Sequence, residues 1–192
     1  MGCKDKINLA DLGKHLKDLP DDFIVLIVSP EDRYESTNIK ILKLLCNEEK
    51  NSGLYITFDK PFDLISNALH DAGVDTDKLF FIDLVTKTKK GNHERTKNCL
   101  FIPSPKEISD LGVAIDESIR ASKNKKGFLF VDSVSALYIY NSSGTAKKFQ
   151  HFLTIRMRIS NLKGILMSLN AGTEEKIIPF LAQFCDKIII VE

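Results

Sequence analysis

The sequence predicts an α/β protein in which helices cover both faces of a mainly parallel sheet, a three-layer α/β/α sandwich. Two observations predict it. Short apolar runs rich in β-branched and aromatic residues recur along the chain, as in strands that are buried on both faces of a parallel sheet. Between them lie segments whose apolar residues recur every three or four positions, as in helices. With 192 residues the chain is long enough for one well-buried domain, so we expect a single domain over residues 1–192.

The first half of the chain alternates between these two patterns. Residues 1–20 are expected to form a helical lead-in, because leucines recur at mostly helical spacing before Pro20. The apolar run over residues 23–28 predicts the first strand, a turn over residues 29–37 follows, and a helical pattern then continues from Ile39. The next expected elements are a strand over residues 54–58, a helix from Pro61 to Gly73 and a strand over residues 79–84.

The second half continues the alternation after a polar, basic stretch over residues 85–98, which should be a loop. The elements expected there are a short strand over residues 100–102, a helix over residues 104–122, strands over residues 128–132, 165–169 and 187–191, and helices over residues 145–162 and 173–184. Because parallel strands deliver their following loops to the same edge of the sheet, these loops should share the rim where ligands bind. They begin at Ser29, Asp59, Val85, Ser133 and Asn170.

Composition excludes several classes of protein. The cysteines Cys3, Cys46, Cys99 and Cys185 lack the spacing of a zinc site or a disulfide framework, which favours reduced thiols and a cytoplasmic protein. No apolar run approaches the length of a membrane span and no signal peptide is present, so we expect no membrane association. The net charge of +1 leaves polyanion binding to local patches.

One segment carries a specific motif. Residues 128–132 are four hydrophobic residues followed by Asp132, and Ser-Val-Ser-Ala-Leu comes next. This segment resembles the Walker B strand of the RecA-like P-loop ATPases, and within them the KaiC-like group common in archaea. Weaker matches are the strand before Ser29, residues 53–60 and the late strand over residues 165–170. The resemblance covers residues 23–192 and implies a RecA-like central sheet.

The resemblance also assigns roles to single residues. It places Ser36 at the P-loop hydroxyl that contacts magnesium, Asp132 at the Walker B carboxylate and Asp59 at the first of two catalytic acids. It places Ser29 and Tyr34 at the P-loop glycines. At the remaining two positions the charge is reversed, since Glu35 stands at the P-loop lysine and Lys60 at the second catalytic acid.

These departures argue against phosphate binding. A P-loop works because glycines let backbone N–H groups converge on phosphate at the positive end of a helix, and its lysine adds a full charge. There is no glycine between Gly13 and Gly53, and Pro30 removes one N–H. A unit charge pair at ~4 Å with effective dielectric ~20 is worth about 4 kcal/mol, and Glu35 turns that attraction into repulsion. Acids in the first turn of a helix can offset its partial charge without a ligand.

The nucleotide crevice is therefore expected to be vestigial, without catalytic residues, cofactor or metal. The residues expected around it are Ser29, Tyr34, Glu35, Ser36, Asp59 and Asp132. The expected function is that of a pseudo-ATPase, a regulatory or signalling module that acts through a protein partner or self-association.

Three alternatives remain open. The first is a divergent ATPase that binds ATP and Mg through Ser36, Asp59 and Asp132. The second is a metal ion held by those residues together with Glu35. The third is nucleic-acid binding through the basic residues 87–97, which is disfavoured because the chain lacks a broad basic excess or interleaved aromatics.

Overall fold

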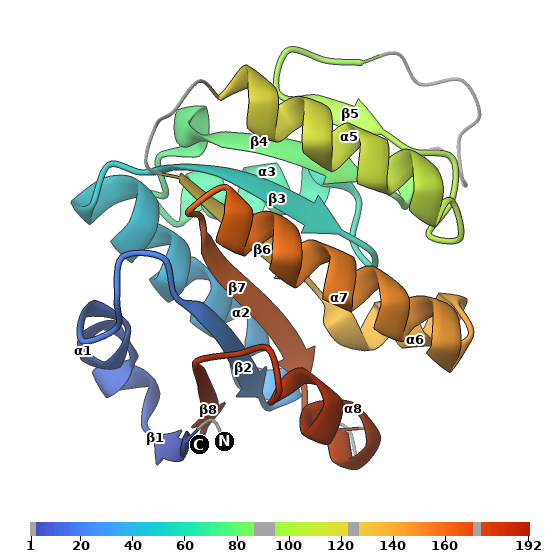
Figure 1. The fold of residues 1–192 in the computed structure, drawn as a ribbon. Coiled ribbons are helices and arrows are strands. Elements are labelled where there is room, and N and C mark those ends of the chain that lie inside the picture. The colour runs from blue at the N-terminus through green and yellow to red at the C-terminus, as the bar shows by residue number, and fades with distance from the viewer. Residues whose placement is uncertain (1–2, 87–94, 123–126, 171–173) are drawn as a thin grey trace.

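The computed structural model describes residues 3–86, 95–122, 127–170 and 174–192, which form one eight-stranded sheet (Figure 1). The strand order is β1-β8-β2-β7-β6-β3-β4-β5, and every pairing between described strands is parallel. The strands are β1 (Cys3–Ile7), β2 (Ile24–Ser29), β3 (Ser52–Thr57), β4 (Leu79–Asp83), β5 (Cys99–Phe101), β6 (Gly127–Asp132), β7 (Lys163–Leu169) and β8 (Lys187–Val191). The prediction of a mainly parallel sheet is confirmed.

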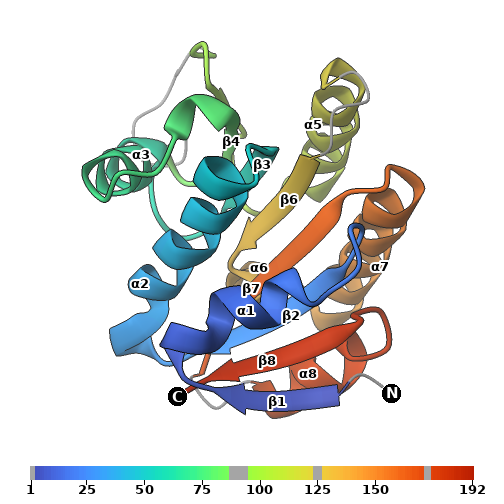
Figure 2. The ribbon, with the colours of Figure 1, turned by 90° about the vertical axis from the view of Figure 1, so that its left-hand side faces the viewer.

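Helices cover both faces of this sheet, as Figure 2 shows in side view. One face carries α1 (Leu12–Lys17), α2 (Glu31–Leu42) and α3 (Phe62–Asp71). The other carries α5 (Ile108–Ala121), α6 (Val134–Tyr140), α7 (Ser143–Ile159) and α8 (Glu174–Leu181). Short turns of other helix types are η1 (Leu9–Asp11), η2 (Lys43–Glu48) and η3 (Thr76–Lys78). The three-layer α/β/α prediction is therefore confirmed.

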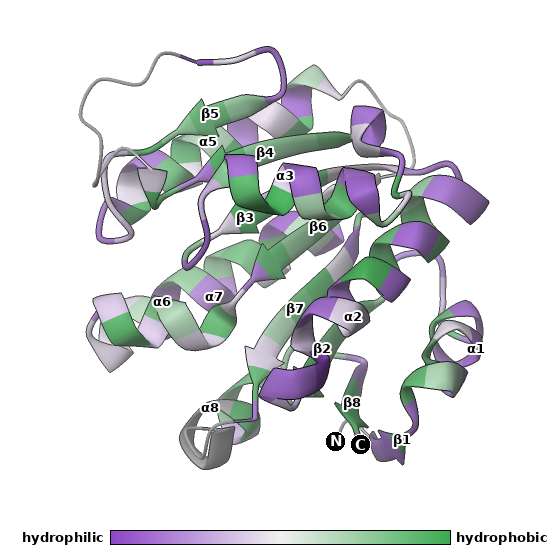
Figure 3. Ribbon diagram, turned by 180° about the vertical axis from the view of Figure 1, so that it is seen from behind, coloured by the Kyte–Doolittle hydropathy of each residue, from purple (hydrophilic) through white to green (hydrophobic). Residues whose placement is uncertain are grey.

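The core lies between the sheet and each helical layer, because neighbouring residues of a buried strand point to opposite faces. In β2, Leu26 packs among the side chains of one layer while Val25 and Ile27 pack in the other. In Figure 3 the strands are mostly green, which marks hydrophobic residues. They lie between helices whose outward sides carry purple, hydrophilic residues. No helix among the residues described above is both long and apolar enough to span a lipid bilayer.

Two segments differ from the sequence-based prediction. Residues 3–7, expected to lie in a helical lead-in, form strand β1, which pairs with β8 at the edge of the sheet. The turn predicted over residues 29–37 is wrong, because α2 begins at Glu31 directly after Pro30. Pro30 has the extended conformation of a helix N-cap, and two acids follow it in the first turn, where they offset the positive end of the helix. Residues 87–94, which belong to the basic stretch expected to form a loop, lie outside the described residues.

A close approach between two strands gives the first testable prediction. A Cβ atom added at Gly53 would lie 2.1–2.6 Å from carbons of the Phe128 ring, which is fully buried. Gly53→Ala is therefore expected to lower the free energy of unfolding by about 2–3 kcal/mol, because the added methyl overlaps the buried ring and one of the two must shift. Gly13→Ala is the matched control: nothing lies within 4 Å of its added Cβ, and alanine in α1 should stabilise by about 0.5–1 kcal/mol. Urea unfolding of both variants tests the difference, and equal stability would contradict it.

Candidate functional site

The carboxyl ends of the parallel strands bring several of the expected crevice residues to one rim of the sheet. In the sheet register, Thr57 at the end of β3 lies between Asp132 on β6 and Asp83 on β4. Ser29 ends β2, which lies next to β7. The carboxyl ends of these parallel strands therefore share one rim, and it carries polar residues from several strands.

The connection between β2 and α2 is a single residue. Strand β2 ends at Ser29, Pro30 alone intervenes, and α2 begins at Glu31. The Ser29 hydroxyl lies 3.0 Å from the hydroxyl of Thr37, which in turn donates to the Arg33 carbonyl. In a P-loop the backbone at this point must curl around the phosphate with its N–H groups pointing inward. Here the same residues form a regular helix.

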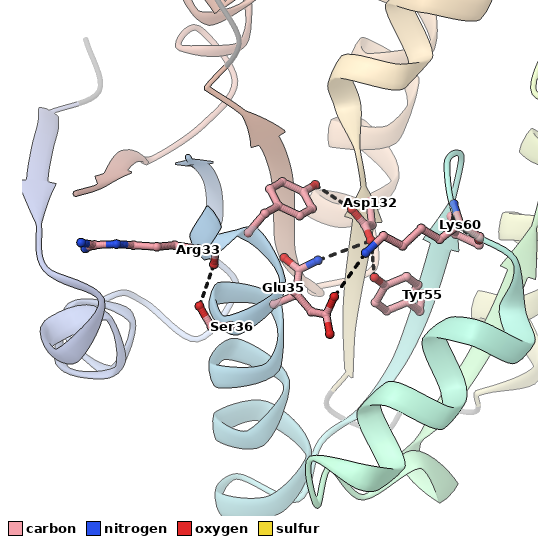
Figure 4. A network of polar contacts seen from close by, with 9 residues as sticks. Arg33, Glu35, Ser36, Tyr55, Lys60 and Asp132 are labelled. Atoms are coloured by element: carbon pink, nitrogen blue, oxygen red, sulfur yellow. Dashed lines mark hydrogen bonds and ion pairs between the residues drawn. The ribbon is translucent and has the colours of Figure 1, made fainter. Parts of the chain in front are cut away.

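The helix places the Tyr34 hydroxyl on the carboxylate of Asp132. The Tyr34 hydroxyl donates to Asp132 Oδ1 at 2.6 Å, and the Tyr55 hydroxyl from β3 donates to Asp132 Oδ2 (Figure 4). The Asn38 amide lies 3.4 Å from Oδ2 as a third, weaker donor. Both oxygens of Asp132 are thus engaged by side chains of the same chain.

Burial decides the electrostatics of this network. Asp132 is only 7% exposed and Tyr55 1%. Burial raises the pKa of the Asp132 carboxyl above its usual range, although the hydrogen bonds from Tyr34 and Tyr55 pull it down. Burial also raises the pKa of both phenols well above the usual value, and the negative charge of Asp132 adds to this. The phenols therefore stay protonated and act as donors.

Packing holds the Tyr55 ring rigidly in place. It stacks on the Phe130 ring at a centroid distance of 4.9 Å and lies 5.3 Å from the ring of Phe81. Tyr55 and Asn38 are the site residues that the sequence did not indicate. The one available signal was a tyrosine inside an apolar strand, since a buried tyrosine hydroxyl needs a hydrogen-bond partner.

The two positions of reversed charge face each other. Lys60 Nζ lies 3.4 Å from Glu35 Oε2, and Figure 4 shows the two side chains reaching toward one another from the β3–α3 connection and α2. Both side chains are more than half exposed, so the pair contributes at most about 1 kcal/mol. The pair shows instead that the charges of Glu35 and Lys60 offset each other.

The structure places Ser36 outside the crevice and Asp59 within it. Ser36 is exposed and donates to the Arg33 carbonyl at 2.8 Å, on the side of α2 away from Asp132 (Figure 4). Asp59 stays at the crevice, where the Ser133 hydroxyl donates to it at 3.1 Å. Burial raises the pKa of the Asp59 carboxyl, with a smaller contribution from Asp132 that exceeds the effect of Lys60. The structure therefore brings Tyr34, Asp59 and Asp132 together and leaves Ser36 outside.

The donor set around Asp132 does not favour a cation. Its oxygens already accept from phenol hydroxyls, and Lys60 adds a positive charge nearby. Within the described part of the chain, no three His, Cys, Asp or Glu side chains are grouped so that they could hold a metal ion.

Comparison with known proteins supports the fold. A scan against protein-family models finds no match, and a search of curated proteins finds none either. Among solved structures, this chain is similar to the crystal structure of a KaiC-like protein from the hyperthermophilic archaeon Pyrococcus horikoshii OT3, with a TM-score of 0.57 and 16% sequence identity. The match covers 81% of this chain and 64% of that one. At this identity the likeness speaks for the fold alone: the chain has the KaiC-like, RecA-type fold.

Proposed function

We propose that this chain is a pseudo-ATPase, a KaiC-like domain that does not use a P-loop nucleotide and acts as a regulatory or signalling module through protein contacts. The observation that carries the proposal is the hydrogen bond from Tyr34 to Asp132, made by a helix that starts one residue after β2. The carboxylate that would serve magnesium in an active relative is satisfied by the protein itself.

Nucleotide binding would carry several costs at once. The first turns of α2 would have to unwind to make a loop, and the phenol hydrogen bonds to Asp132 would have to break, each costing about 1.5–3 kcal/mol. The phosphates would then approach the carboxylates of Glu31, Asp32 and Glu35. A total of about 4–6 kcal/mol corresponds to a loss of roughly three to four orders of magnitude in affinity.

Isothermal titration with Mg-ATP and Mg-ADP tests the proposal. We expect no saturable heat at nucleotide concentrations up to the millimolar range, and no shift of the thermal unfolding midpoint, because a bound ligand would stabilise the fold. Saturable binding at low micromolar concentration would contradict the proposal. Asp132→Asn is the control for binding elsewhere, since weak heat that it leaves unchanged does not come from the crevice.

The second candidate is a divergent ATPase. It is favoured because Asp59 remains at the crevice, close enough to Asp132 for the charge of Asp132 to raise the pKa of the Asp59 carboxyl. A phosphate-release assay on the unmodified chain separates the two functions. Hydrolysis that Asp132→Asn abolishes would support the ATPase and contradict the pseudo-ATPase.

A further inference from the structure

We draw no further inference here: the strongest candidate, the cavity of about 430 Å³ at the amino ends of β3, β4 and β6, is lined by charges of both signs, Asp77 with Lys78 and Arg95, and residues 123–126, which join two of its lining residues, lie outside the described ranges, so nothing in the structure shows what would occupy it.

Discussion

Tyr55→Phe is expected to lower the free energy of unfolding by about 2–3 kcal/mol at neutral pH. The change removes a hydroxyl that donates to Asp132 Oδ2 and leaves a buried carboxyl with one partner fewer. Tyr34→Phe removes the donor to Oδ1 and should cost a similar amount. Because both tyrosines serve one carboxyl, the double variant should not lose the sum of the two values.

Urea unfolding of the single and double variants measures these losses. Tyr140→Phe is the matched control, because Tyr140 is partly exposed at the end of α6 and no hydrogen bond of its hydroxyl to another described residue is resolved. Its removal should change stability by less than about 0.5 kcal/mol. A loss from Tyr55→Phe as small as that of the control would contradict the network as the main restraint on Asp132.

The same variants have a predicted pH dependence. Since burial raises the pKa of Asp132 and of Asp59, the folded chain binds more protons than the unfolded chain between the unfolded and folded pKa values. The stability that protonation contributes is fully present below the unfolded pKa and is lost as pH rises through the folded one. Asp132→Asn should flatten part of this decline. Tyr55→Phe should extend it to higher pH, because it removes a hydrogen bond that lowers the pKa of Asp132.

Asp83→Ala is expected to lower the free energy of unfolding by about 4 kcal/mol, the largest loss of any single change proposed for this chain. The side chain of Asp83 is fully buried at the end of β4. It accepts from the backbone N–H groups of Phe62, Val85 and Thr86 at 2.6–2.9 Å, and from the Thr86 hydroxyl. Alanine would leave these donors without a partner where little water reaches them.

Two further variants sharpen this test. Asp83→Asn keeps one acceptor oxygen and should recover about half of the loss. Asp77→Ala, at an exposed position of η3, should change stability by less than about 0.5 kcal/mol. Thermal and urea unfolding give both values, and a loss below about 1 kcal/mol for Asp83→Ala would mean that water replaces the carboxylate.

The positions of most core strands could be predicted because strands that are buried on both faces of a parallel sheet consist of continuous apolar runs. Strand β1 escaped prediction because its charged residues Lys4, Asp5 and Lys6 reflect a place at the sheet edge. The start of α2 was misplaced for another reason. The motif comparison suggested a loop after Ser29, whereas Pro30 followed by two acids is a helix start on local grounds alone.

The sequence indicated several residues of the site, but it did not indicate the hydrogen bonds and ion pairs between them. The sequence identified Asp132 as the end of a buried strand and Glu35 and Lys60 as reversed charges. It did not show that Glu35 and Lys60 pair, because residues 25 positions apart meet only once the fold is known. The partners of Asp132 are farther still, at 77 and 98 positions for Tyr55 and Tyr34. Residue type predicts that a buried carboxyl needs donors; only packing decides which ones.

The place of β8 in the sheet has a consequence for how the chain is made. Strands β1 and β2 follow each other in sequence but do not pair, because β8 lies between them. During synthesis β1 therefore has no strand to pair with in this sheet until residues 187–191, which form β8, have left the ribosome. Until then the wholly buried strand β2 has an open edge of unpaired N–H and C=O groups, which is a template for pairing with other chains. Strand β8 thus both pairs with β1 and covers the open edge of β2.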